Sequence, residues 1–387
     1  MPAVSIEPVQ TKAQLKEFVA FPWRIYANDP LWVPPFFRER MQFFSPKHNP
    51  FFEHADVQLF LARGRDGQAL GTVAAIIDHL HISFHQEQVG FFGHFECVDD
   101  AEVAGALFTA AANWLSERGM TAMRGPMNMS TNHECGLLVQ GFDSPPVVMM
   151  TYNPPYYERL VQDAGFSKVM DLYAYILNTD FYQNQVDNLP QKVLESCRKL
   201  KEEGKIRIRK ASLARFEQEL VAAKQVYNSA WQRNWGFVPM TEAEIEHLAR
   251  GLKRFIDPDL VYFAEDDGQP VGIVVALPDI NEVLLRIRPQ PGGLLRFLYD
   301  GARFLWAKRT RPRLFRWLIM GVVEGYRGRG IDACFYVETA RAALAKGYTQ
   351  CEMSWILETN TMMNRILQRL GGRIYKVYRI YEKPLST

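Results

Sequence analysis

Apolar residues recur along the chain in two spacings, and the alternation of these spacings predicts an α/β fold. Runs in which every second residue is apolar are typical of strands, and apolar residues three and four positions apart are typical of helices. Asp66-Gly67 separates two of the strand-like runs, which is a hairpin signal. The first half is predicted as strand 4–8, helix 13–28, strands 57–63, 69–77 and 89–97, helix 102–118, strand 121–124, helix 156–164 and strand 169–177, with an irregular insertion at 125–148.

The second half repeats the order of the first. Segment 263–272 matches 61–71 apart from one inserted residue, and 365–371 matches 159–165. A tryptophan-rich loop reaches Val-Pro near the start of each half, and the helix that ends at Gly347 corresponds to the helix that ends at Gly119. We interpret these matches as two copies of one α/β unit, at 1–182 and 189–387, with a boundary near 180–188. The alternative is a pair of unrelated hairpins that share Asp-Gly-Gln.

Composition and charge exclude some classes of function. The 387 residues, 48% of them hydrophobic, provide enough material for two cores. A net charge of +2 gives no general attraction to nucleic acid, so we expect no nucleic-acid partner. The five cysteines are scattered without a C-x-x-C pair, which favours reduced thiols in a cytoplasm. We also expect no secretory signal, no membrane-spanning helix and no metal, since His79, His81 and His85 are more typical of a turn.

The segment 321–330 is the candidate functional motif. An apolar run at 318–320 precedes it, and the residues Ala333, Val337, Ala340 and Leu344 after it form one face of a helix. A strand, a glycine-rich turn and a helix in this order direct backbone N–H groups and a helix dipole at one point, where an anion can bind. Gly328 and Gly330 permit close approach, and Arg327 and Arg329 add positive charge. A surface turn is the alternative interpretation.

The first copy differs at the corresponding positions. When Gly347 is aligned with Gly119, Gly328 falls on Asp100 and Gly330 on Glu102. These carboxylates, together with Asp99, would repel a pyrophosphate by about 1 kcal/mol per pair at ~4 Å in water. We therefore expect only the second copy to bind the anionic group.

This order of elements resembles that of the GNAT (Gcn5-related) N-acyltransferase family. The family signature, Gln/Arg-x-x-Gly-x-Gly/Ala, grips the pyrophosphate of coenzyme A, and it matches Gly328 and Gly330 within 326–331 but departs at Gly325. The resemblance implies two tandem GNAT-like units, each a mixed and mostly antiparallel sheet flanked by helices. It implies acetyl-CoA or a longer acyl-CoA as co-substrate.

The resemblance also assigns roles to residues outside the turn. Backbone N–H groups of Val322 and Val323 would polarise the thioester carbonyl, Asn360 would contact the pantetheine arm, and Ile331 would begin the phosphate-binding helix. Many members carry a tyrosine seven residues after that asparagine, but here the position is Leu367. The last strand offers Tyr375, Tyr378 or Tyr381 as an acid instead, and we select Tyr378.

An amine must lose a proton when it attacks a thioester, so we expect a general base. The candidates are Glu324, at the end of the strand before the turn, and Glu352, Glu358 and His247. Each glutamate has a simpler interpretation. Glu324 fits a solvated turn, and Glu352 fits a buried ion pair with an arginine.

A basic and apolar insertion, 279–318, interrupts the second copy. Its arginines and lysine lie between 286 and 316, and its middle mixes bulky apolar with basic residues at helical spacing. One interpretation is a helix that lies in the plane of an anionic membrane, with Trp306 at the interface. The protein would then be peripheral to an inner membrane. A second is a helix that packs on the first copy and directs its arginines to water. A third, ranked below both, is a surface for a phosphorylated nucleotide or nucleic acid.

The leading hypothesis is an acyl-CoA-dependent N-acyltransferase acting on a small-molecule or lipid amine. The basic insertion favours a second version, similar to the bacterial GNAT-like acyltransferases of ceramide synthesis, which join an acyl chain to a long-chain base. A third hypothesis, a non-catalytic acyl-CoA-binding or scaffold protein, is motivated by Gly325 and Leu367.

Overall fold

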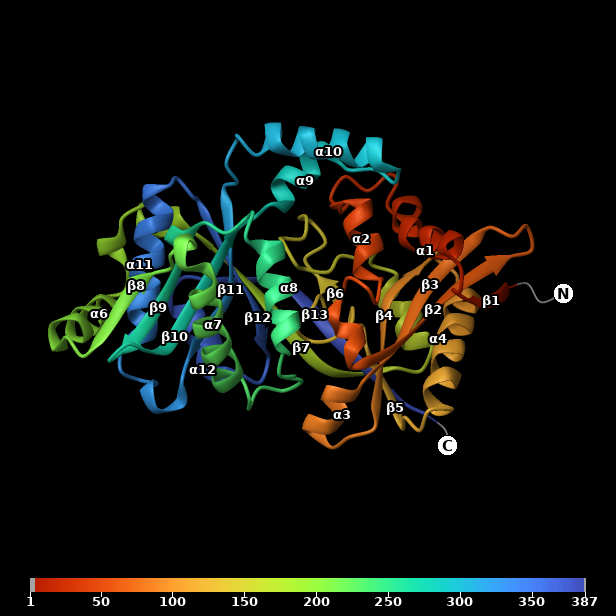
Figure 1. The fold of residues 1–387 in the computed structure, drawn as a ribbon, viewed down its shortest axis with the longest axis horizontal. Coiled ribbons are helices and arrows are strands. Elements are labelled where there is room, and N and C mark those ends of the chain that lie inside the picture. Colours follow the sequence, from red (N-terminus) through yellow and green to blue (C-terminus); the bar gives the residue numbers. More distant parts are fainter. Residues whose placement is uncertain (1–3, 386–387) are drawn as a thin grey trace. The chain divides into compact units, whose positions relative to one another are not determined.

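A computed structural model describes residues 4–385 and divides the chain into two compact units. Unit 1 comprises Met1–Leu172, Asn281–Thr310 and Lys376–Thr387, and unit 2 comprises Tyr173–Ile280 and Arg311–Tyr375. Figure 1 shows the elements of each unit along the chain. Residues 1–3 and 386–387, at the outer ends of the two predicted copies, lie outside the described range.

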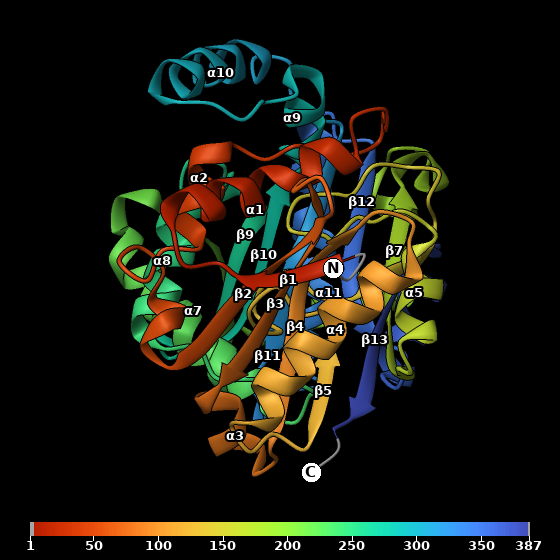
Figure 2. The ribbon, with the colours of Figure 1, turned by 90° about the vertical axis from the view of Figure 1, so that its right-hand side faces the viewer.

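Unit 1 is a mixed sheet covered by helices (Figure 2). Its strands follow the order β1-β2-β3-β4-β5-β13, and every pairing is antiparallel except the parallel pair β4 and β5. Its elements are β1 (Val4–Pro8), α1 (Lys12–Ile25), α2 (Phe37–Phe43), β2 (Ala55–Gly64), β3 (Ala69–Asp78), α3 (His79–His85), β4 (Val89–Cys97), α4 (Ala101–Ser116), β5 (Ala122–Gly125), β6 (Leu137–Gln140), α5 (Tyr157–Asp163), α9 (Asn281–Ile287), α10 (Leu294–Ala307) and the larger part of β13 (Arg373–Pro384).

Unit 2 repeats this plan, with the strand order β7-β12-β11-β10-β9-β8, in which β11 and β12 pair in parallel and the neighbours from β11 to β8 pair antiparallel. Its elements are the second half of β7 (Ser167–Asn178), α6 (Gln191–Glu203), β8 (Ile206–Lys210), α7 (Phe216–Ala230), α8 (Glu242–Leu252), β9 (Val261–Asp266), β10 (Gln269–Pro278), β11 (Leu314–Val322), the short 3₁₀ helix η6 (Glu324–Tyr326), α11 (Ile331–Ala345), β12 (Gln350–Leu357) and α12 (Thr361–Arg369).

The predicted α/β fold with mostly antiparallel sheets is confirmed. Asp66-Gly67 forms the turn of the hairpin β2–β3, and Gly119, at φ +81°, ends the helix α4. The boundaries 1–182 and 189–387 concern the repeat and stay a prediction. The compact units differ from them, because α9 and α10 belong to unit 1 and because β7 and β13 each run from one unit into the other.

The insertion at 279–318 is shorter than its sequence indicates. The strand β11 begins at Leu314 rather than after 317, since Phe315 and Trp317 are core residues of unit 2. Arg316, predicted to lie in the basic insertion, is 1% exposed and belongs to that strand.

Candidate functional site

The glycine turn of unit 2 leads directly from β11 through η6 into α11 (Figure 1). Gly328 and Gly330 have φ of +74° and +89°, a conformation that costs other residues conformational strain. A Cβ on Gly330 would lie 2.9 Å from the carbonyl oxygen of Ser196, so this glycine is also required by packing. The predicted strand, turn and helix are therefore present.

The N-terminus of α11 has no side-chain cap. Its first turn begins with Ile331, which is 1% exposed and anchors the helix in the core. The N–H groups of a helix's first turn have no partner within the helix and carry the positive end of its dipole. This end of a 15-residue helix is suited to an anion, and the role of Gly328, Gly330 and Ile331 in binding one stays a prediction.

The strands β11 and β12 separate next to this turn. Their parallel pairing runs only from Leu314↔Gln350 to Trp317↔Met353, while β11 continues to Val322 and β12 to Leu357. The register of β11 with β10 shifts at the same place, where Leu318 is an extra residue. A bulge bends and twists a strand, which explains why a V-shaped opening forms here.

Backbone groups at the edge of this V already form hydrogen bonds within the sheet. The N–H of Val323 donates to the carbonyl of Val271 over 2.9 Å, so polarising a thioester would require sharing this bond. Val322 pairs with Gly272 at the end of the β10–β11 ladder. The roles assigned to Val322 and Val323 stay predictions.

The two arginines of the turn contact protein groups. The guanidinium of Arg327 donates to the carbonyls of Val322 and Ala230, at 3.2 and 2.8 Å, and thereby links the end of β11 to the end of α7. Arg329 lies over the ring of Tyr326, 4.8 Å from its centroid. Both arginines are exposed, so each keeps a surface that can face an anion.

Asn360 is the N-cap of α12. Its side-chain oxygen accepts the N–H of Met363 over 3.1 Å. This bond uses the oxygen and leaves the amide NH₂ for another acceptor, which is compatible with the predicted contact to a pantetheine arm.

The predicted acid–base residues lie in different environments. Glu324 is exposed and pairs with Arg233 over 2.9 Å, whereas Glu352 is 0% exposed and faces Arg316. Tyr378 is fully buried and belongs to unit 1. The remaining base candidates are Glu358, which is half-buried after β12, and His247, which is exposed on α8. Leu367, at the position where many family members carry a tyrosine, is a core residue. The catalytic roles of these groups stay predictions.

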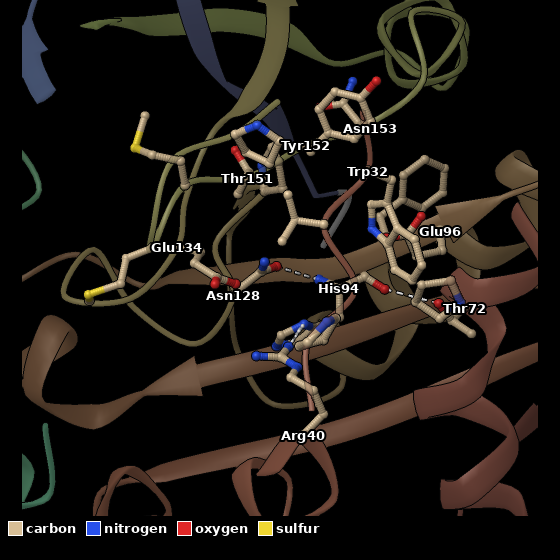
Figure 3. Close-up of a pocket in the computed structure, with 18 of the residues that line it drawn as sticks. Trp32, Arg40, Thr72, His94, Glu96, Asn128, Glu134, Thr151, Tyr152 and Asn153 are labelled. Atoms are coloured by element: carbon tan, nitrogen blue, oxygen red, sulfur yellow. Dashed lines mark hydrogen bonds between the residues drawn. The ribbon is translucent and has the colours of Figure 1, made fainter. Parts of the chain in front are cut away.

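A cavity of about 210 Å³ lies in unit 1, and none of the predicted site residues lines it (Figure 3). Glu96 of β4 lines it, and its Oε2 accepts hydrogen bonds from the hydroxyls of Tyr26 and Tyr157, at 2.9 and 2.8 Å. Enclosure by protein raises the pKa of Glu96 to about 7, against the lowering effect of the two tyrosines and of Arg40. A carboxylate with such a pKa in a cavity is a candidate functional group.

Within residues 4–385, no group of three or more His, Cys, Asp or Glu side chains could hold a metal ion. His79, His81 and His85 lie on the short helix α3, where His79 contacts Asp56 and His81 contacts Glu87, at 3.0 and 2.8 Å.

Comparison with known proteins supports this architecture. The chain is 39% identical to the bacterial ceramide synthase of Caulobacter vibrioides, over 99% of this chain and 98% of that protein. It is 38% identical to protein YghO of Escherichia coli, over 97% of this chain and 94% of that protein. No protein-family model matches.

Two solved structures share the fold at low sequence identity. A tandem GNAT protein from the clavulanic acid biosynthesis pathway is 10% identical, with 99% of both chains covered and a TM-score of 0.58. A GCN5-related N-acetyltransferase from Sphaerobacter thermophilus is 13% identical, with 100% of this chain and 97% of that chain covered and a TM-score of 0.52.

The two-unit fold, the opened strands and the glycine turn define a tandem GNAT-fold protein. The chain belongs to the family that includes the bacterial ceramide synthase of C. vibrioides and protein YghO. It is an enzyme of the N-acyltransferase class.

Proposed function

We propose that this enzyme transfers an acyl group from acyl-CoA to the amine of a lipid at a membrane surface. The observation that carries the cofactor assignment is the uncapped N-terminus of α11 behind Gly328 and Gly330, next to the opening between β11 and β12. The carboxylates Asp99, Asp100 and Glu102 take this place in the aligned first copy, and there the side chain of Asp100 caps α4 by accepting the N–H groups of Glu102 and Val103. We therefore assign the pyrophosphate to unit 2.

The reaction balances as a direct transfer. The amine nitrogen attacks the thioester carbonyl, the new C–N bond forms, the C–S bond breaks, and the thiolate leaves while the amine proton passes to a base. Within unit 2, Glu324 follows the β11 arm of the V, and Glu352 lies on β12 in the last part of its pairing with β11, just before the strands separate. Glu324, Glu352 and Tyr378 stay the proposed proton carriers, and Val322, Val323 and Asn360 the proposed contacts to the acyl-pantetheine arm.

Calorimetry of acyl-CoA binding tests the cofactor site. Gly328→Glu places a carboxylate where the pyrophosphate is assigned, so we expect at least a tenfold loss of affinity. Gly251→Glu is the matched control, because Gly251 lies on the exposed surface of α8 with open space around it. Unchanged binding in Gly328→Glu would show that the pyrophosphate binds elsewhere.

The helix α10 supports the membrane assignment. Its exposed apolar residues include Leu295, Leu298 and Trp306, which are 84%, 56% and 73% exposed, and also Leu294, Tyr299 and Leu305. At 3.6 residues per turn, these six positions fall within an arc of about 140° on one face. Arg296 and Arg303 border this face, and Lys308 and Arg309 follow the helix. An outward apolar face with flanking basic residues is typical of a helix that lies in a lipid interface.

The inner face of α10 holds it on unit 1. Phe297 and Phe304 contact Phe36, with ring centroids 6.0 and 5.7 Å apart. Asp300 is 1% exposed and pairs with Arg296 and Arg303, at 2.8 and 3.6 Å. Packing therefore accounts for the inner face and leaves the leucines and Trp306 of the outer face without a buried role.

Vesicle flotation tests this surface. None of the helices within residues 4–385 is long and apolar enough to cross a membrane, so binding would depend on surface contact. We expect the protein to float with phosphatidylglycerol vesicles, and the double variant Leu295→Asp, Trp306→Asp to remain in solution. Val221→Asp on α7 is the control, because Val221 is an exposed apolar residue, at 65%, outside α10. Equal recovery of the wild type and the double variant with the vesicles would overturn the assignment.

The name of the C. vibrioides relative supports a lipid amine as acceptor. Thiol release from long-chain acyl-CoA, measured with a panel of short and long-chain amines, tests this choice. We expect the long-chain amines to be preferred. If no amine accelerates thiol release while acyl-CoA binds, the non-catalytic acyl-CoA-binding hypothesis is favoured.

A further inference from the structure

The cavity in unit 1 depends on an irregularity in β4. Thr72 pairs with Glu96 and Ala74 with Gly93, so β4 contains one more residue than β3 between these pairs. His94 has a φ of +48°, its N–H donates to the side chain of Asn128 over 2.7 Å, and its carbonyl accepts the hydroxyl of Thr72 over 3.1 Å (Figure 3). Both sides of the bulge are therefore fixed by hydrogen bonds.

The bulge decides which way Glu96 points. Phe92, Phe95 and Cys97 all belong to the core beneath α4, although regular alternation would place Phe92 and Glu96 on the same face. The extra residue reverses the alternation, and Glu96 consequently faces the cavity instead of the core.

The hydrogen bonds of Glu96 leave one oxygen for a ligand. The N–H of Cys97 donates to the hydroxyl of Tyr157, which in turn donates to Oε2 of Glu96. Tyr26 donates to the same Oε2. Among residues 4–385 no further hydrogen bond to this carboxylate occurs, so Oε1 can accept one from a molecule in the cavity.

The charges and rings around the cavity favour a cation. Besides Glu96 the lining includes Glu134, and its one arginine, Arg40, is held by the ring of Phe43 and by Nδ1 of His94, at 4.5 and 3.4 Å. Burial lowers the pKa of His94 well below its usual value, with further lowering by the charges of Arg40 and His133, so His94 is neutral. Trp32 lines the cavity and stacks on Tyr26 at 4.9 Å between centroids. Carboxylates and aromatic faces together are the groups that recognise an ammonium ion.

The size of the cavity limits what enters it. Its 210 Å³ is below the roughly 300–1,000 Å³ of sites for drug-sized ligands, so it suits a head group and part of a chain. Trp23, Val33 and Leu284 add apolar lining. Leu284 belongs to α9, and the next helix along the chain is α10.

We propose that this cavity binds the ammonium head group of a long-chain amine, with Oε1 of Glu96 as the anionic ligand and Trp32 as the aromatic wall. This inference rests on the proposed function for the class of ligand. It assigns the acceptor to unit 1, the copy without a phosphate turn, and it gives that copy a binding function of its own.

Titration of the intact protein with octylamine, followed by calorimetry and by tryptophan fluorescence, tests the proposal without CoA. We expect Glu96→Gln to weaken octylamine binding at least tenfold, and octanol, which has no charge, to bind weakly to both proteins. The control is Glu102→Gln, which removes an exposed carboxylate of the same unit and should leave binding unchanged. Equal affinity of the wild type and Glu96→Gln would overturn the assignment. Loss of acyl-CoA binding in Gly328→Glu is measured separately, so the two proposals can fail independently.

The pH dependence gives a second measurement that does not rely on one variant. The ionised carboxylate attracts the ammonium ion, so wild-type affinity should fall as pH drops below about 7, where Glu96 gains its proton. Tyr157→Phe keeps the carboxylate but removes a hydrogen bond that favours its charged form, so the fall should begin at a higher pH. The role of Glu96 would be contradicted if the affinity for octylamine stayed constant between pH 6 and 8, which is roughly one pH unit on each side of that pKa.

Discussion

Arg316 and Glu352 are direct neighbours across the parallel strands β11 and β12, with Nε 3.5 Å from Oε2 and both side chains shielded from solvent. Removing one member of such a buried pair leaves an uncompensated charge, which costs about 3–5 kcal/mol. We therefore expect Glu352→Ala to lower the free energy of unfolding by this amount in urea denaturation.

The double variant Arg316→Met, Glu352→Leu separates structure from catalysis at the same position. Apolar residues of similar volume often replace a buried ion pair at little cost, so its stability should lie within about 1–2 kcal/mol of the wild type. If Glu352 only stabilises the strands, the folded double variant keeps acyl transfer, measured as thiol release. A stable double variant without activity would instead support the predicted role of Glu352 as a base.

The two glycines of the turn should respond differently to alanine. Both have positive φ, which costs an alanine about 1 kcal/mol, but only at Gly330 would the new Cβ approach a backbone atom, the oxygen of Ser196 at 2.9 Å. We expect Gly328→Ala to lose about 1 kcal/mol and Gly330→Ala clearly more, because α6 and α11 must move apart. Urea denaturation of the two variants side by side checks this order, and equal losses would contradict it.

Asn360 allows the helix cap to be separated from a cofactor contact. Asn360→Ala removes the acceptor for the N–H of Met363 and should destabilise the protein by about 1 kcal/mol. Asn360→Asp keeps that acceptor but lacks the amide NH₂. Its stability should therefore be unchanged, while its acyl-CoA affinity falls if the NH₂ contacts the pantetheine arm. Calorimetry and thermal unfolding of both variants test this, and full affinity in Asn360→Asp would reduce Asn360 to a cap.

The local elements were predictable because each has its own sequence signal. Asp66-Gly67 marks a hairpin, Gly119 ends a helix, and the glycines at 328 and 330 lie between an apolar run and a helical face. These signals depend on backbone conformation within a few residues. The alternative interpretation of Glu352, a buried pair with an arginine, also agrees with the structure, although the sequence places its partner Arg316 in the basic insertion.

The cavity was not predictable for a physical reason. Alternation places Glu96 on the face of Phe92, and only the bulge at His94 reverses it; that bulge is fixed by Asn128, 34 positions away in the sequence. The hydroxyls that bind Glu96 come from the residue that caps the end of α1 and from the start of α5. In the aligned sequence Glu96 takes the place of Glu324, since each lies 23 residues before the matched glycines Gly119 and Gly347. The repeat thus contained a hint of Glu96, but Glu324 is exposed and could not indicate a cavity.

Glu96 should make the stability of the protein depend on pH in a definite direction. Its pKa is about 7 in the folded chain and near 4.5 when unfolded, so between these values the folded state holds a proton that the unfolded state has lost. The free energy of unfolding therefore falls as pH rises from about 4.5 to 7, by up to roughly 3 kcal/mol, and no further above that range. Glu96→Gln has no charge to bury, so its stability relative to the wild type should increase between pH 5 and pH 8 (values near the two ends of the titration). Urea denaturation of both proteins at these two pH values measures this difference. If the difference in stability between the two proteins is the same at pH 5 and pH 8, the carboxylate of Glu96 is in a water-like environment.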